Sequence, residues 1–132
     1  MRNFGRVIFP PFILCDKWYN IQKGVIMINI ENLREYYKQD QVFITNHASE
    51  RFRMRNIKMV DIKSGLYTGE IIEQYPDDFP FPSCLISGMT NDERHIHIVM
   101  SDEGSSSRII TAYIPAIDKW ESDFKTRKEH KV

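Results

Sequence analysis

The sequence predicts an α+β fold in which helices pack on one face of a small antiparallel sheet of four to five strands, with a further helix at the C-terminus. Three observations lead to this prediction. Apolar residues recur at helical spacing in the first half of the chain, strand-like runs separated by turn-forming connectors fill the second half, and helical spacing returns near the end. Because the connectors between the strand-like runs are short, neighbouring strands are expected to be antiparallel.

The first half predicts three helices and one short strand. Asn46 is a good N-cap residue for the middle helix, and Gly69 is a typical residue just past the end of the next. The expected elements are a helix over residues 30–39 with Ile30, Leu33, Tyr36 and Tyr37 at helical spacing, a strand at Val42–Thr45, a helix from Asn46 or His47 to about Asn56, and a helix over residues 58–68 with Met59, Ile62 and Leu66 inward.

The second half predicts four strands and a final helix. Its connectors PDDFPFPS, TNDER and DEGSSS are rich in turn formers. The last segment carries Ile117, Trp120 and Phe124 at helical spacing, which predicts a C-terminal helix laid on the sheet. The expected strands are EIIEQY at 70–75, CLISGM at 84–89, HIHIVMS at 95–101 and RIITAYI at 108–114.

Composition limits the classes of partner. The 132 residues are 42% hydrophobic and 27% charged with a net charge of zero, which is typical of one small globular domain and gives no support to duplex DNA as a partner. No apolar run approaches the roughly 20 residues that a membrane span needs. The two cysteines, Cys15 and Cys84, have no metal-binding or disulfide spacing, so we expect reduced thiols in a cytoplasmic protein.

Residues 1–26 differ from the rest. Codons for Lys23 to Ile26 can spell a purine-rich ribosome-binding sequence just ahead of Met27, and MINIENLREYYK reads like an ordinary protein start. Pro10 and Pro11 interrupt the apolar run that would otherwise suggest a secretion signal. We therefore expect residues 1–26 to be a poorly ordered, dispensable extension from an upstream start codon, and residues 27–132 to form a single domain.

A stripe of basic residues marks the middle helix. His47, Arg51 and Arg55 fall four residues apart, so they share one side of the helix. The helical projection places Ala48 and Phe52 on one side of this stripe and Met54 on the other, so the stripe is expected to point toward the protein rather than to share the solvated side that carries Arg53. Buried charges need partners. Either carboxylates such as Glu70, Glu73 or Asp61 neutralise the stripe, or the stripe lines a cleft that receives an anion.

The strand HIHIVMS carries a second polar signal. Alternation places His95, His97 and Val99 on one face. On the next strand, alternation groups Ile109 with Thr111 and Tyr113. His97 and Tyr113 suit either a hydrogen-bonded scaffold or proton transfer. His95 and His97 could chelate a metal, but no third ligand stands at a recognisable spacing, so no metal site is predicted.

Several short motifs, taken in order, resemble a bacterial domain of unknown function, number 4258. The resemblance runs from about residue 42 to residue 128. The motifs are His47-Ala48-x-x-Arg51, Arg55-x-Ile57, Gly69-Glu70-Ile71-Ile72 with Tyr75, Ile96-His97-x-Val99, Thr111-x-Tyr113-x-Pro115, and Trp120, Phe124 and Arg127.

This resemblance implies a fold like that of the RelE/ParE-type toxins and, as partners, RNA and a small antitoxin-like protein. RelE-type members cut mRNA without a metal, using basic residues and sometimes a histidine or tyrosine as acid or base. The balanced charge departs from that pattern, because proteins that dock on RNA tend to be basic.

Two functions from different classes follow. The first is a toxin-like, metal-independent endoribonuclease. Arg51 and Arg55 would bind phosphate, His47 would act as acid or base, and His97 or Tyr113 would take the other proton role. RNA supplies its own nucleophile, so no cofactor is expected. The alternative is a non-catalytic interaction module in which the stripe is a structural salt-bridge network and Phe79 and Phe81 form a contact surface.

Overall fold

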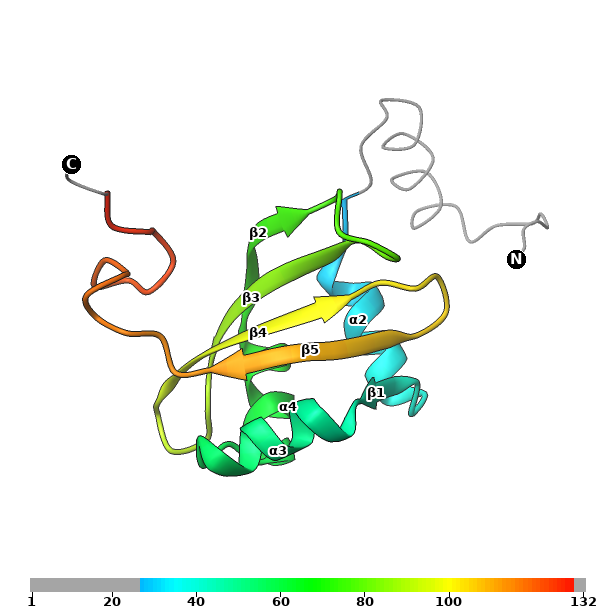
Figure 1. Ribbon diagram of the computed structural model, residues 1–132, viewed down its shortest axis with the longest axis horizontal. Coiled ribbons are helices and arrows are strands. Elements are labelled where there is room, and N and C mark those ends of the chain that lie inside the picture. Colours follow the sequence, from blue (N-terminus) through cyan, green and yellow to red (C-terminus); the bar gives the residue numbers. More distant parts are fainter. Residues whose placement is uncertain (1–26, 130–132) are drawn as a thin grey trace.

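The computed structural model describes residues 27–129 and has the α+β architecture that the sequence predicts. The expectations for residues 1–26 lie outside the described residues. Within residues 27–129, three helices and one five-stranded sheet make up the fold (Figure 1). The elements are α2 (Ile30–Lys38), β1 (Val42–Ile44), α3 (Asn46–Met54), α4 (Met59–Thr68), β2 (Glu70–Tyr75), β3 (Ser83–Met89), β4 (His95–Ser101) and β5 (Ser107–Tyr113).

The helix termini follow from local sequence. Asn29 caps α2, because its side chain accepts a hydrogen bond from the backbone N–H of Glu31. For α3 the cap is Thr45 rather than the expected Asn46, and its hydroxyl accepts from the N–H of Ala48 at 3.0 Å. Gly69 ends α4 as predicted.

The sheet has the strand order β1-β5-β4-β3-β2 and is mixed. Strands β2 to β5 form an antiparallel meander, as the short connectors predict. The expectation of a purely antiparallel sheet is wrong at one edge, because β1 pairs parallel to β5. The chain leaves β1 for two helices and returns through three strands, and this long crossover permits parallel pairing.

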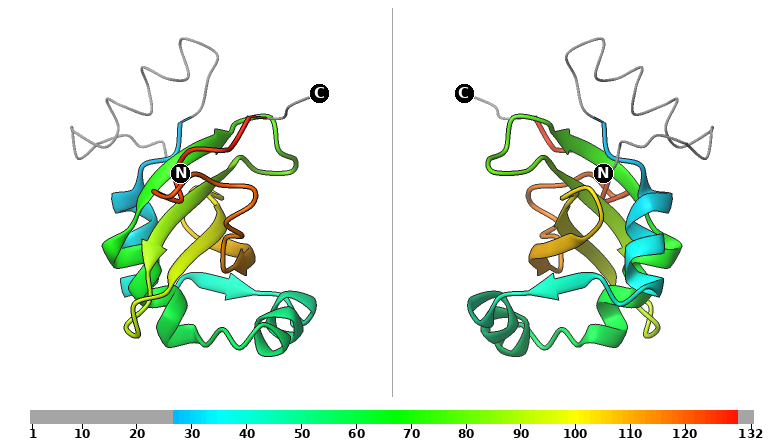
Figure 2. Two further views of the ribbon diagram at one scale, coloured as in Figure 1. Left: turned by 90° about the vertical axis from the view of Figure 1, so that its left-hand side faces the viewer. Right: turned by 90° about the vertical axis from the view of Figure 1, so that its right-hand side faces the viewer.

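One face of the sheet is apolar, with α2 and α4 on its side and α3 beside β5 at the sheet's edge (Figure 2). Ile86 of β3, Ile96 and Ile98 of β4, and Ala112 of β5 are buried against Leu33, Phe52 and Leu66 of the helices. The thiol of Cys84 lies in the same layer, and burial raises its pKa to about 12. No helix within residues 27–129 is long and apolar enough to cross a bilayer.

The helical layer comes very close to the sheet where α4 crosses β3. A Cβ added at Gly88 would lie 2.2 Å from the carbonyl oxygen of Gly65 and 2.8 Å from its Cα. On either side of this contact, Ser64 donates to the Met89 carbonyl at 2.7 Å and Thr68 accepts from the Met89 N–H at 3.0 Å. Helix and strand therefore meet backbone to backbone.

Two β-bulges change which residues point away from the helices. In β2 the register shifts between Ile71 and Glu73, so Glu70, Glu73 and Tyr75 all pair with residues of the opposite face. In β5 the shift falls between Thr111, which pairs with Val99, and Ile109, which pairs with Met100. Ile110 between them therefore has no pairing residue on β4. The alternation that grouped Ile109 with Thr111 and Tyr113 is therefore wrong, since Ile109 is fully buried in the core.

The predicted C-terminal helix is absent. Residues 114–129 form turns and one isolated bridge between Trp120 and Arg127. Trp120 is nevertheless buried as expected, while Ile117 is exposed and contributes no helical apolar stripe. The sequence SDFKTR favours a turn, because the Asp123 carboxylate accepts hydrogen bonds from the N–H groups of Lys125 and Thr126.

We expect Gly88→Ala to lower the free energy of unfolding by at least about 2 kcal/mol, because the added methyl group overlaps backbone atoms that cannot rotate away. Denaturant unfolding measures this change. Lys63→Ala, on the exposed side of α4, is the control and should change stability by less than about 0.5 kcal/mol. A Gly88→Ala protein as stable as the control would show that α4 can move off the sheet without cost.

Candidate functional site

The basic stripe of α3 lies on the surface. His47, Arg51 and Arg55 are all exposed, which corrects the expectation that they point toward the protein. Ala48 and Phe52 of the same helix are buried and aim at the core. Helix α3 packs beside β5, so the stripe flanks the helix's apolar side instead of running through it.

The arginines of the stripe donate hydrogen bonds to neutral groups rather than to carboxylates. The guanidinium Nε of Arg51 donates to His47 Nε2 at 3.1 Å. Arg55 donates from one guanidinium nitrogen to the Ala112 carbonyl at 2.8 Å and to the Thr111 hydroxyl at 3.2 Å. Within residues 27–129 neither arginine has an acidic partner.

The acids named as partners for the stripe bind other cations. Asp61 pairs with Arg94, Glu70 with Lys125 and Glu73 with Arg127. The first of the two sequence interpretations, a stripe neutralised by carboxylates, therefore does not hold for the described residues. The cationic side chains of Arg51 and Arg55 remain available to an external anion.

His97 and Tyr113 meet on the other face of the sheet. They are cross-strand partners on β4 and β5, with Nδ1 of His97 3.4 Å from the Tyr113 hydroxyl. His97 has no solvent exposure, and burial lowers its pKa. Tyr113 is half-buried, and burial raises its pKa. His97 therefore has no direct access to solvent, whereas the tyrosine has some.

The C-terminal segment covers this pair. His97 Nε2 hydrogen-bonds the Phe124 carbonyl at 2.7 Å, and Ser87 donates to the same oxygen at 3.2 Å. The indole of Trp120 packs edge-on against His97 with ring centres 4.5 Å apart. The imidazole is thus held on two sides by residues 120–124.

An ion pair fixes the end of the covering segment to β2. Arg127 donates to both carboxylate oxygens of Glu73, at 2.7 and 3.0 Å, and its guanidinium carbon lies 4.6 Å from the centre of the Trp120 ring. These hydrogen bonds lower the pKa of Glu73. Tyr75 donates to Glu73 at 2.5 Å, and burial together with this bond raises the pKa of the phenol to about 12.

The structure brings the predicted residues together in two groups rather than one. His47 and Arg51 lie on α3, and His97 and Tyr113 lie under the C-terminal segment. Arg55 connects the two groups, because it binds the hydroxyl of Thr111, which shares a sheet face with Tyr113. Residues two apart on a strand are about 7 Å apart, so Arg55 and Tyr113 lie near each other at the edge of β5.

Sequence reasoning missed Glu73 as a member of the second group. Its place depends on the bulge at Ile72, which simple alternation does not reveal. Because residues 117–124 were predicted to be helical, the hydrogen bond between the Phe124 carbonyl and His97 was not predicted either. Within residues 27–129 no three His, Cys, Asp or Glu side chains converge to hold a metal ion.

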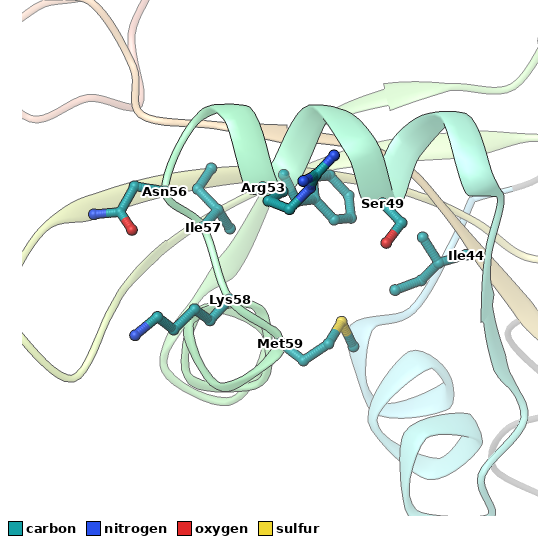
Figure 3. Close-up of a pocket in the computed structure, with 8 residues that line it drawn as sticks. Ile44, Ser49, Arg53, Asn56, Ile57, Lys58 and Met59 are labelled. Atoms are coloured by element: carbon teal, nitrogen blue, oxygen red, sulfur yellow. The ribbon is translucent and has the colours of Figure 1, made fainter.

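A pocket lies between α3 and α4, away from both groups (Figure 3). Its volume is about 270 Å³, and its walls contain none of His47, Arg51, His97 or Tyr113. The lining is apolar at Ile44, Phe52, Ile57 and Met59, with Arg53 and Lys58 at the rim.

The family model described as Domain of unknown function (DUF4258) matches residues 44–114. This span is more than half of the chain, and the chain belongs to this family. The match runs from the end of β1 to just beyond β5, so it includes the α3 stripe, His97 and Tyr113 but not Trp120, Phe124 or Arg127. Comparison with curated proteins and with solved structures gives no match.

Folding stability should depend on the protonation of His97. The unfolded imidazole has a pKa of about 6.5, and the folded value is lower because the ring is buried. Below about pH 6.5 the unfolded chain therefore binds a proton that the folded chain resists, and stability falls with pH by up to about 1.4 kcal/mol per unit. Denaturant unfolding between pH 7 and pH 5 measures the slope.

His97→Gln keeps a donor for the Phe124 carbonyl and removes the titration, so it should flatten this slope. Glu73 acts in a separate window, because its folded pKa is lowered from 4.5 and its contribution is lost only as pH falls below that value. An unchanged slope in His97→Gln between pH 7 and pH 5 would show that another group is responsible.

Trp120→Ala should destabilise the fold by roughly 3–5 kcal/mol, as removal of a buried tryptophan usually does. Trp120 is 4% exposed and packs against both His97 and Arg127, although no helix carries it. Urea unfolding of the variant beside Ile117→Ala, whose side chain is exposed, gives the comparison. A loss below about 1 kcal/mol for Trp120→Ala would mean that the C-terminal segment contributes little to stability.

Proposed function

We propose that this protein is a toxin-like endoribonuclease that cleaves RNA without a metal, by attack of a ribose 2′-hydroxyl on the adjacent phosphorus. The observation that carries the proposal is the exposed pair of His47 and Arg51, 3.1 Å apart, on a stripe with no acidic partner among residues 27–129. A proton-transfer group beside a guanidinium is what such a cleavage requires.

Each residue of the stripe has a role in this reaction. Arg51 and Arg55 bind the scissile phosphate, and their charge stabilises the pentacovalent phosphorane as negative charge builds on its oxygens. His47 accepts the proton of the 2′-hydroxyl at Nε2, which becomes free when the guanidinium of Arg51 turns from it to the phosphate. The new bond joins the 2′-oxygen to phosphorus, and the bond from phosphorus to the 5′-oxygen breaks.

The leaving 5′-oxygen needs a proton, and Tyr113 is the candidate donor. Burial raises the pKa of Tyr113, so its hydroxyl is protonated at neutral pH. His97 is fully buried and touches the Tyr113 hydroxyl, which makes it a positioning residue in this proposal rather than the acid. A fold related to the RelE/ParE-type toxins and an antitoxin-like partner belong to the same proposal.

A non-catalytic interaction module is the second candidate. The network of His97, Tyr113, Trp120, Arg127 and Glu73 favours it, because every one of these side chains has a structural contact that accounts for it without catalysis. The salt-bridge network that this candidate expected on α3 is not formed within residues 27–129. The stripe is therefore the feature that separates the two functions.

Arg51→Ala should reduce RNA cleavage by about 10²–10³-fold, the usual loss when a group that stabilises transition-state charge is removed. Stability should change by less than about 0.5 kcal/mol, because Arg51 is exposed and its side chain bonds to the equally exposed His47. The measurements are cleavage of single-stranded RNA by the purified protein, growth after induced expression, and denaturant unfolding.

Arg53→Ala is the matched control, since it removes the same kind of side chain from an exposed position on the same helix and should leave cleavage unchanged. A wild type that neither cleaves RNA nor arrests growth would rule the nuclease out. A loss of stability well above about 0.5 kcal/mol in Arg51→Ala, with cleavage unaffected, would instead make Arg51 a structural residue and favour the interaction module.

A further inference from the structure

The loop between β2 and β3 presents an exposed aromatic side chain. Phe79 is 94% exposed, more than any other large hydrophobic residue that the structure describes. Asp77 and Asp78 precede it, and within residues 27–129 neither has a cationic partner. The loop thus presents an apolar tip flanked by two negative charges, a combination that an apolar pocket with a basic rim could bind.

The loop is held in shape before any contact forms. Pro76, Pro80 and Pro82 restrict its backbone. The N–H of Asp78 donates to the Tyr75 carbonyl at 3.3 Å, and the Ser83 hydroxyl donates to the Asp78 carboxylate. Because the loop is already ordered, docking Phe79 into a partner would lose little conformational entropy.

The pocket between α3 and α4 has the complementary character. Phe52, Ile57 and Met59 give it an apolar lining, and Arg53 and Lys58 lie at its rim. Arg53 also pairs with Glu50, whereas the Lys58 ammonium has no carboxylate partner among the described residues. The volume of about 270 Å³ exceeds the roughly 150 Å³ of a cavity that holds a benzene ring.

The two features lie at opposite ends of the molecule. Figure 1 shows the β2–β3 connection at the top of the sheet and α3 and α4 at the bottom. The side view in Figure 2 shows the same separation. Phe79 therefore cannot reach the pocket of its own chain, and only another molecule can supply the ring.

We propose that the pocket between α3 and α4 binds Phe79 of a second copy of this chain, with Asp77 and Asp78 of that copy facing Lys58 and Arg53. The contact joins two different surfaces, so each added molecule leaves one loop and one pocket free. Association therefore continues head to tail, and because each contact rests on one ring and a few charges it is weak. This self-association is independent of the proposed nuclease activity.

Sedimentation velocity of the full-length protein tests the proposal. The weight-average sedimentation coefficient of the wild type should rise with protein concentration from the micromolar into the millimolar range. Phe79→Ala, which removes the ring, and Lys58→Glu, which reverses the charge at the rim, should each abolish the rise. Phe43→Ala removes another exposed phenyl ring from β1 and should leave the rise unchanged.

Two mixing experiments make the test specific. Phe79→Ala retains the pocket and Lys58→Glu retains the loop, so an equimolar mixture of the two variants should form a dimer and nothing larger. The double variant Asp77→Lys with Lys58→Glu exchanges the charges and should associate again. A wild type that stays monomeric throughout, a Phe79→Ala protein that associates like the wild type, or a mixture that stays monomeric would each overturn the proposal.

Discussion

The fold depends on the backbone contact between α4 and β3. Gly65 and Gly88 meet without any intervening side chain, and Ser64 and Thr68 bind the main chain of Met89 beside them. This contact fixes the distance between the helical layer and the middle of the sheet. The isoleucines of β3 and β4 belong to the same core as buried residues of all three described helices. A larger residue at either glycine would lift the whole layer, because packed interiors cannot absorb such an overlap locally.

With the helices fixed on one face, the opposite face takes on a different chemistry. There imidazole, phenol, hydroxyl and carboxylate groups lie beside Leu85 and Val99, and the cover is an irregular segment rather than a helix. Polar groups under such a cover need individual partners. His97 has the Phe124 carbonyl and Glu73 has Arg127, so specific polar contacts hold the covering segment together with the buried ring of Trp120.

The order of helices and strands could be predicted from sequence because apolar periodicity records burial directly. The α3 stripe could also be found, since spacing alone places His47, Arg51 and Arg55 on one side of a helix. Its exposure could not be predicted, because the projection of a helix does not say how far the apolar side is rotated against the sheet.

The bulges at Ile72 and Ile110 could not be predicted either, since each depends on pairing with a neighbouring strand. The prediction of a C-terminal helix was wrong. It rested on the helical spacing of Ile117, Trp120 and Phe124, but hydrogen bonds of the Asp123 side chain favour a turn in this segment.

The unequal lengths of β1 and β5 affect how the sheet meets other proteins. β1 covers only residues 107–109 of the outer edge of β5, and beyond them Arg55 occupies the carbonyl of Ala112. At the far side of the sheet, β2 is bent by its bulge and carries Glu70 and Glu73 with their cationic partners. Edges with these features are poor templates for an incoming strand. These edges therefore disfavour edge-to-edge pairing between sheets of different molecules, as occurs in amyloid. Contacts between molecules are expected to form through side chains instead.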